Sequence, residues 1–173
     1  MRFDLAQSVL LLEKTPAVLR TLLSDLPQEW ISSDEGSATW SPFDILGHLI
    51  HGEETDWIPR TKIILDRSMK PFEPFDRFAQ DEQSKGKTLV QLMDTFTLLR
   101  ENNVAELKSL EISEADLELT GIHPELGEVT LKNLLATWTA HDLSHLSQIT
   151  RVMAKQYRHE IGVWTKYMKI MHT

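Results

Sequence analysis

Two histidines with a spacing suited to metal chemistry lie in the stretch 137–149, which reads TWTAHDLSHLSQI. His141 and His145 are four residues apart within an apolar pattern typical of a helix, so they share one face with Cβ atoms about 5–6 Å apart. This spacing suits two imidazole nitrogens that bind one metal ion at about 2.0–2.1 Å. The alternative is two core histidines that are only hydrogen-bonded, because buried polar groups need partners. The spacing alone leaves both interpretations open.

A firm divalent site needs a third ligand from another part of the chain, and His48 is the first candidate. His51 lies three residues further on and could share the same helix face, so it is the reserve candidate. Three neutral nitrogen ligands leave a position for water or substrate, as in a catalytic metal site. The sequence contains no cysteine, which excludes disulfides, thiolate ligands and a cysteine nucleophile.

Long helices must carry these histidines, and apolar residues recur at helical spacing almost throughout the chain. Capping boxes predict two helix starts, one at Ser41 with Asp44 and one at Thr88 with Gln91. The pattern predicts four long helices and one short C-terminal helix, over about 5–22, 41–64, 88–110, 130–157 and 161–171. We expect Pro16 to bend or delay the first of them and Pro59 to kink the second.

The expected helix faces follow from steps of three and four residues. The first buries a stripe of Leu5, Val9, Leu12, Val18 and Leu22, and the fourth a stripe of Leu134, Trp138, His141, His145, Ile149 and Val152. The last short helix is expected to anchor through Trp164, Tyr167 and Met168.

Two connections have features of their own. The segment 68–87 is a long loop with three phenylalanines, which is typical either of a binding loop or of a loop pinned to the bundle by its aromatic rings. The segment 120–130 reads as a turn or a short extended pair. Gly47 and Gly52 are unusual inside a helix, and either close packing of a neighbouring helix or space beside a site explains them.

Composition indicates one domain, residues 1–173, with an all-α architecture, because four long helices in one domain make a bundle. The net charge is −8 and no Lys/Arg cluster stands out, so neither a nucleic acid nor an anionic membrane is an expected partner. No run of eighteen apolar residues occurs and the N-terminus does not read as a signal peptide, so we expect a cytoplasmic protein.

Several stretches together resemble the DinB-like family, the damage-inducible YfiT type, and its second subgroup in particular. The matching stretches cover nearly the whole chain in order: TWSPFDILGHLIHGEETDWIPR, PFEPFDRFA, LRENN, GIHPELGEVTLKNLLATWTAHDLSHLSQITRVMAKQY and IGVW. Each stretch is generic when taken singly, whereas the ordered set is specific.

The resemblance implies an up-down four-helix bundle with a long crossover loop, which is often a homodimer. It also implies a divalent metal ion, zinc or nickel, held by one histidine of the second helix and the H-x-x-x-H pair of the last long helix. Those positions correspond here to His48, His141 and His145. Characterised relatives include transferases and isomerases that depend on low-molecular-weight thiols.

Three functions remain open, and the first is a metal-dependent thiol S-transferase that acts on a small electrophile. Its thiol must come from a cosubstrate, and Arg60, Arg67 or Arg151 could bind a carboxylate of that small-molecule partner. The second is a metal-dependent hydrolase that uses metal-bound water, with Asp142 or Glu54 as proton acceptor. The third is a non-enzymatic metal-binding or stress-response module, in which the metal is a structural clamp.

Overall fold

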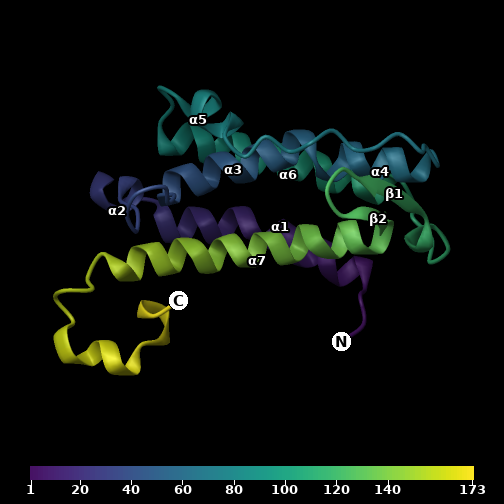
Figure 1. The fold of residues 1–173 in the computed structure, drawn as a ribbon. Coiled ribbons are helices and arrows are strands. Elements are labelled where there is room, and N and C mark those ends of the chain that lie inside the picture. The colour runs from purple at the N-terminus through teal and green to yellow at the C-terminus, as the bar shows by residue number, and fades with distance from the viewer.

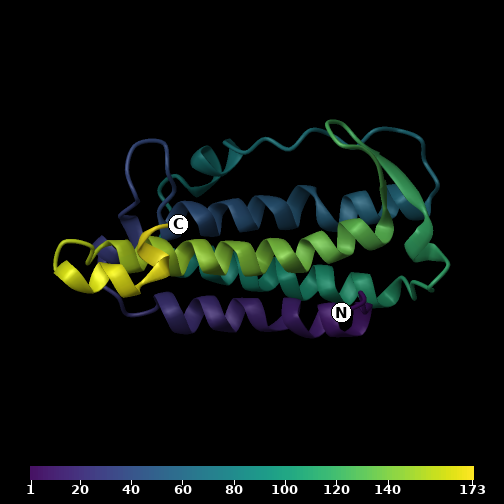
Figure 2. The same cartoon turned by 60° about the horizontal axis from the view of Figure 1, so that its bottom comes forward.

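The computed structural model describes all 173 residues, and four long helical segments lie side by side in it (Figure 1). They are α1 (Leu5–Leu23), α3 with α4 (Pro42–Thr55 and Trp57–Leu65), α6 (Leu89–Ser109) and α7 (Leu131–Lys155). The α3–α4 segment runs antiparallel to α1, whereas α6 runs in the same direction as α3–α4 and α7 returns (Figure 2). The connection from α4 to α6 therefore crosses the length of the bundle. The expected four-helix bundle with a long crossover is confirmed.

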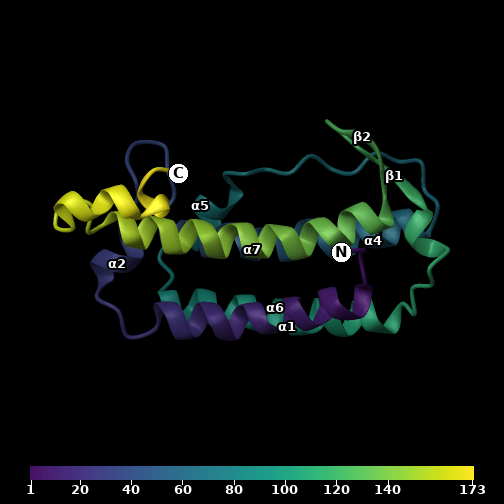
Figure 3. The ribbon, with the colours of Figure 1, turned by 90° about the horizontal axis from the view of Figure 1, so that it is seen from below.

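Short elements complete the chain, most of them at the two ends of the bundle (Figure 3). The strands β1 (Thr120–His123) and β2 (Gly127–Thr130) form an antiparallel hairpin in which His123 pairs with Gly127. This hairpin is the extended pair that the sequence predicts. The remaining elements are α2 (Gln28–Ser32), α5 (Ala79–Ser84) and the 3₁₀ turns η1 (Asp116–Glu118), η2 (Gly162–Tyr167) and η3 (Lys169–Met171).

Capping boxes set the starts of the helices, as predicted for α3 and α6. The Ser41 side chain accepts the Asp44 backbone N–H, and the Asp44 carboxylate accepts the Ser41 backbone N–H at 2.9 Å. Thr88 and Gln91 make the same pair of bonds at the start of α6. Each box satisfies two backbone donors that a helix start otherwise leaves without partners.

Helix α1 continues through Pro16, which is buried within it. The predicted stripe is wrong at Val18, which is 46% exposed, because the buried face instead passes through Leu12, Pro16 and Leu19. In the second segment, α3 and α4 are separated at Asp56, three residues before Pro59. A proline has no N–H to donate to the carbonyl four residues earlier, and its ring collides with that carbonyl. For Pro59 this carbonyl belongs to Thr55, the last residue of α3, so the break falls where the proline predicts it.

Two apolar clusters fill the bundle, one on either side of its middle. The first contains Leu12, Trp57, Val104 and Trp138 among its members, and the second contains Leu19, Ile50, Phe96 and Ile149 among its members. On α3, α6 and α7 alike, charged side chains lie in the sequence between members of the two clusters. These side chains are Glu53, Arg100 and Asp142, and all three are buried. A polar layer therefore crosses the middle of the core.

The crossover and the C-terminus differ in how they attach to the bundle. Phe72 is buried and its backbone N–H donates to the Ile122 carbonyl, so the crossover is tied to β1, while Phe78 is exposed. The segment that the sequence predicts as a short C-terminal helix consists of 3₁₀ turns. The prediction of the side chains that anchor it is wrong. Trp164 and Tyr167 are exposed there, and Met171 is the buried side chain.

No helix combines the length and the apolar character that spanning a bilayer requires. The homodimer stays a prediction.

Candidate metal centre

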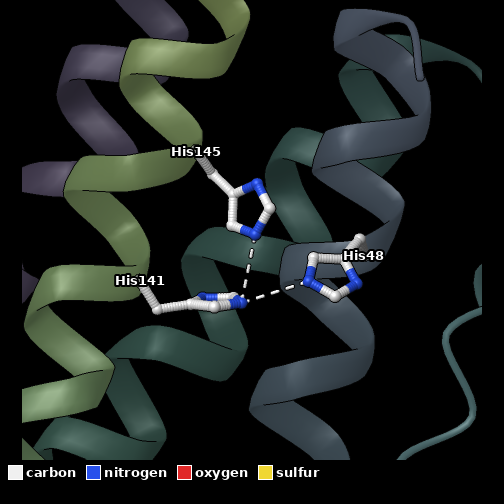
Figure 4. Close-up of side chains that lie close together, drawn as sticks. All are labelled: His48, His141 and His145. Atoms are coloured by element: carbon white, nitrogen blue, oxygen red, sulfur yellow. Dashed lines mark hydrogen bonds between the residues drawn. The ribbon is translucent and has the colours of Figure 1, made fainter. Parts of the chain in front are cut away.

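Three histidine side chains from two helices point toward one another (Figure 4). The Nε2 atom of His141 lies 3.1 Å from the Nε2 atom of His48 and 3.1 Å from that of His145. His48 comes from α3, and the other two are one turn apart on α7. Each ring offers one nitrogen to the same place, within 4.8 Å of the others. The structure thus brings together the three histidines that the sequence singles out.

This geometry fits a divalent ion. Nitrogens bound at about 2.0–2.1 Å with a tetrahedral angle between them lie about 3.3–3.4 Å apart. The two 3.1 Å separations are close to that value, and the three ligand nitrogens all lie within 4.8 Å of one another. In a pure hydrogen-bond cluster, the single Nε2 atom of His141 would have to share one proton or one lone pair between two other nitrogens.

The surroundings keep these rings in the neutral form that binds a metal. Burial, with smaller contributions from His145, His51 and Arg77, lowers the pKa of His48 to about 3. Burial likewise lowers the pKa of His141 to about 3, with His145, His48 and Arg100 adding to the effect. Burial also lowers the pKa of His145.

Neighbouring side chains hold the three rings in place. The Nδ1 atom of His145 lies 2.8 Å from the Gln148 side-chain oxygen, a contact that orients the ring and leaves its Nε2 atom facing the other histidines. The Trp40 ring lies 4.8 Å from the His48 ring, and the Trp57 ring lies 5.2 Å from the His141 ring.

His51, the reserve ligand, is buried but lies outside the three-histidine cluster. Its ring packs on Phe75 of the crossover, with centroids 4.8 Å apart.

Gly47 precedes His48 because α5 packs directly over it. A Cβ atom built at Gly47 would lie 2.4 Å from the Ser84 Oγ atom and 3.3 Å from the Gln80 Cβ atom. Close packing by a helix, one of the two explanations expected for this glycine, is therefore the one found. At Gly52 the nearest atom would be the Trp57 Nε1 atom at 3.4 Å, an ordinary contact.

A buried ion network joins the helices that carry the histidines. The Arg100 guanidinium of α6 donates to both Asp142 carboxylate oxygens, at 2.6 and 2.9 Å, and to the Glu53 carboxylate at 2.8 Å. Glu53 also accepts from the Trp138 indole at 2.9 Å and the Asn103 amide at 3.0 Å. Two carboxylates and one guanidinium leave a net charge of −1 in the core beside the histidines. This negative charge favours the binding of a cation at the neighbouring histidines.

Sequence reasoning missed Arg100, Glu53 and Asn103 as parts of the site. The signal available was a charged or amide side chain at a position where the helical pattern calls for an apolar one. Charged residues are so frequent on helices that this signal does not single out the three of them.

The five other candidate residues have different surroundings. Both carboxylate oxygens of Asp142 are held by Arg100, and Glu54 is exposed on α3. Arg151 makes two hydrogen bonds to Glu35, at 2.8 and 2.7 Å. Arg60 is buried and paired with Asp56 at 2.8 Å. Arg67, named with these arginines, is exposed.

A cavity of about 230 Å³ adjoins the histidine cluster. His48 and His141 line it, together with the Asp56–Arg60 pair and His123 of the hairpin. Burial raises the pKa of Asp56 to about 6, against the opposing effects of Arg60 and His51. The cavity therefore brings a carboxylate that titrates near neutrality to the histidine cluster, and neither Asp56 nor His123 stands out in the sequence as a site residue.

Comparisons with known proteins agree with this architecture. The sequence profile of the DinB superfamily matches residues 11–149. A protein of Oceanobacillus iheyensis, named as a candidate metal-dependent hydrolase, is 22% identical over 154 residues, which cover 84% of this chain and 83% of that one. A Bacillus cereus protein with the same kind of name is 28% identical over 141 residues, covering 80% and 79%.

Among solved structures, that of YfiT from Bacillus subtilis is similar to this chain. It is described as a probable metal-dependent hydrolase with an unusual four-helix bundle topology. The TM-score is 0.75 at 20% sequence identity, and the match covers 88% of this chain and 86% of that one. At this identity the likeness establishes the shared fold.

Proposed function

The chain belongs to the DinB superfamily, and we propose that it is a metal-dependent hydrolase whose ion is held by His48, His141 and His145. The observation that carries the proposal is the convergence of three Nε2 atoms beside a cavity that His48 and His141 line. An ion held by three neutral nitrogens acts as a Lewis acid and lowers the pKa of a bound water toward 7. The names of similar proteins support hydrolysis over thiol transfer, which gains no supporting observation.

Within the proposal, Asp56 takes the role of proton acceptor. It lines the cavity with two of the histidines, and its pKa of about 6 leaves it mostly ionised at neutral pH. Asp142 is unsuited to this role because Arg100 holds both of its oxygens. Glu54 is exposed on the outside of α3 and lines no part of this cavity. Asp142 instead holds α7 in position through Arg100.

Zinc and nickel are the proposed ions, because imidazole nitrogens suit both. A site of three neutral ligands with an adjoining cavity differs from closed structural zinc sites, which have four protein ligands. The chain also has two buried apolar clusters, and a domain of this length can fold on such a core without a metal. These two features favour an enzyme over a structural clamp.

The proposal is tested by turnover of small esters and amides by zinc-loaded and nickel-loaded protein, with and without added glutathione. We expect metal-dependent hydrolysis that needs no thiol and that is lost in His145→Ala. His159→Ala is the matched control, because this histidine is exposed in the turn that follows α7 and is not part of the three-histidine cluster. Turnover that requires the thiol supports the S-transferase instead and contradicts the hydrolase.

A further inference from the structure

The cavity beside the histidine cluster has mainly apolar walls. Trp57 and Leu134 line it from the bundle, Phe72 and Phe75 from the crossover, and Val129 from the hairpin. Its volume of about 230 Å³ equals roughly eight water volumes at about 30 Å³ each. A group of that size with apolar surface, such as a phenyl ring or a short acyl chain, fits such a space.

His123 of β1 adds one polar group to these walls, and the hairpin turn fixes which of its nitrogens is protonated. Its Nδ1 atom accepts the backbone N–H groups of Glu125 at 3.1 Å and Leu126 at 3.2 Å. A nitrogen that accepts two hydrogen bonds has no proton, so a neutral ring must have its proton on Nε2. His123 is therefore a hydrogen-bond donor through Nε2 and not a base through it.

The surroundings keep the ring neutral and in place. Burial and the positive charge of Arg60 lower the pKa of His123 below its usual value. The Phe72 ring lies edge-on to it with centroids 6.4 Å apart. The turn itself depends on Gly127, whose φ of +76° is a conformation that favours glycine.

We propose that His123 binds the substrate by donating its Nε2–H to the carbonyl oxygen of a small, uncharged ester or amide with an apolar side group. The assignment rests on the proposed hydrolase function and deepens it by naming the substrate class. An uncharged substrate follows from the lining, because its one arginine, Arg60, is already paired with Asp56. Apart from the proposed metal ion, the lining offers a phosphate or carboxylate no unpaired lysine or arginine side chain.

The first test is independent of metal and turnover. Long-range ¹H–¹⁵N NMR of the imidazole rings reports which nitrogen of His123 is protonated, and benzamide serves as a small uncharged amide probe. We expect the Nε2–H form in the free protein and a shift of the Nε2 resonance when benzamide is added. An Nδ1–H form, or an Nε2 resonance that benzamide leaves unchanged, overturns the assignment.

The second test separates the two nitrogens by substitution. In His123→Asn the side-chain oxygen can replace Nδ1 as the acceptor of the turn, but no donor reaches the position of Nε2. In His123→Gln the amide can replace the Nε2 donor, but the turn loses its acceptor. For phenyl acetate hydrolysis by zinc-loaded protein, we expect kcat/KM to fall about tenfold in His123→Asn, as one lost hydrogen bond implies, and less in His123→Gln.

Thermal stability should change in the opposite order, with His123→Gln the less stable of the two. If kcat/KM instead follows stability, His123 acts only through the turn and the assignment is overturned. If the unaltered protein releases no phenol with either metal, the hydrolase proposal has failed. The NMR titration with benzamide then decides the assignment of His123 on its own.

Discussion

The Arg100 guanidinium donates through Nη1 to the Leu12 carbonyl oxygen at 2.9 Å. That oxygen lies four residues before Pro16, which has no N–H to give it. Arg100 therefore supplies the hydrogen bond that the proline removes from α1, while its other bonds go to Glu53 of α3 and Asp142 of α7. One side chain links the remaining three segments of the bundle, two of which carry the histidines.

Replacing Arg100 with methionine should destabilise the protein by about 3–5 kcal/mol, because it leaves two buried carboxylates without their cation. The free energy of unfolding from urea denaturation at pH 7 measures this loss. Arg158→Met is the matched control, since Arg158 is exposed and should change stability by no more than about 0.5 kcal/mol. Similar stabilities of the two variants would show that the network does not hold the helices together.

Gly47→Ala should destabilise the protein by about 1–3 kcal/mol, because the new Cβ atom meets α5 at Ser84 and Gln80. Gly52→Ala on the same helix meets only an ordinary contact and should be neutral or stabilise by up to about 1 kcal/mol. Urea denaturation of both variants gives the comparison. Adding Ser84→Ala to Gly47→Ala should recover part of the loss. The packing explanation is wrong if the two glycine variants behave alike.

Glu35→Gln should show a stability loss that depends on pH. The hydrogen bond from Arg151, with help from Lys155, lowers the pKa of Glu35 from 4.5 to about 2. A carboxyl group with a lowered pKa in the folded state stabilises it above the unfolded pKa, and this contribution disappears as pH falls from about 4.5 toward 2. We expect a loss of about 2 kcal/mol at pH 7 that shrinks steadily below pH 4.5.

Urea denaturation of Glu35→Gln and the unaltered protein at pH 7, 5, 4 and 3 measures that difference. Glu29→Gln provides the comparison, because Glu29 is exposed and should show almost no difference at any of these values. A difference for Glu35→Gln that is as large at pH 3 as at pH 7 would contradict the ion pair with Arg151.

Asp56→Asn should remove the acidic limb of the pH profile for hydrolysis. Only the ionised carboxylate accepts a proton, and burial raises its pKa to about 6 against the effects of Arg60 and His51. In the unaltered protein kcat/KM should therefore rise with pH through about 6. The residual activity of Asp56→Asn, measured at saturating zinc, should lack this rise. If the rise through pH 6 persists in Asp56→Asn, it belongs to another titrating group and not to Asp56.

The helices and the three histidines could be predicted from the sequence because their signals are local. Capping residues such as Ser41 and Thr88 bond to backbone groups three residues away, and the spacing of His141 and His145 places them on one helix face. His48 follows from the need for a third ligand. These inferences use distances along the chain that a helix fixes.

The rest of the site depends on contacts between segments far apart in the sequence. Glu53 and Arg100 are 47 residues apart, and either alone reads as an ordinary surface residue of a helix. Asp56 enters the cavity because the helix breaks before Pro59, and His123 because a hairpin turns it toward α4 and α7. The stripe of α1 was misplaced at Val18 because the continuation of the helix through Pro16 depends on tertiary contacts.

The most direct test of the three-histidine centre is the metal content of purified protein after incubation with zinc and removal of unbound ions. We expect about one ion per chain in the unaltered protein and in His51→Ala, whose histidine lies outside the cluster. His48→Ala, His141→Ala and His145→Ala should each lose the ion while circular dichroism shows an unchanged helical fold. Metal-free unaltered protein, or zinc that is retained in all three variants, would contradict the centre.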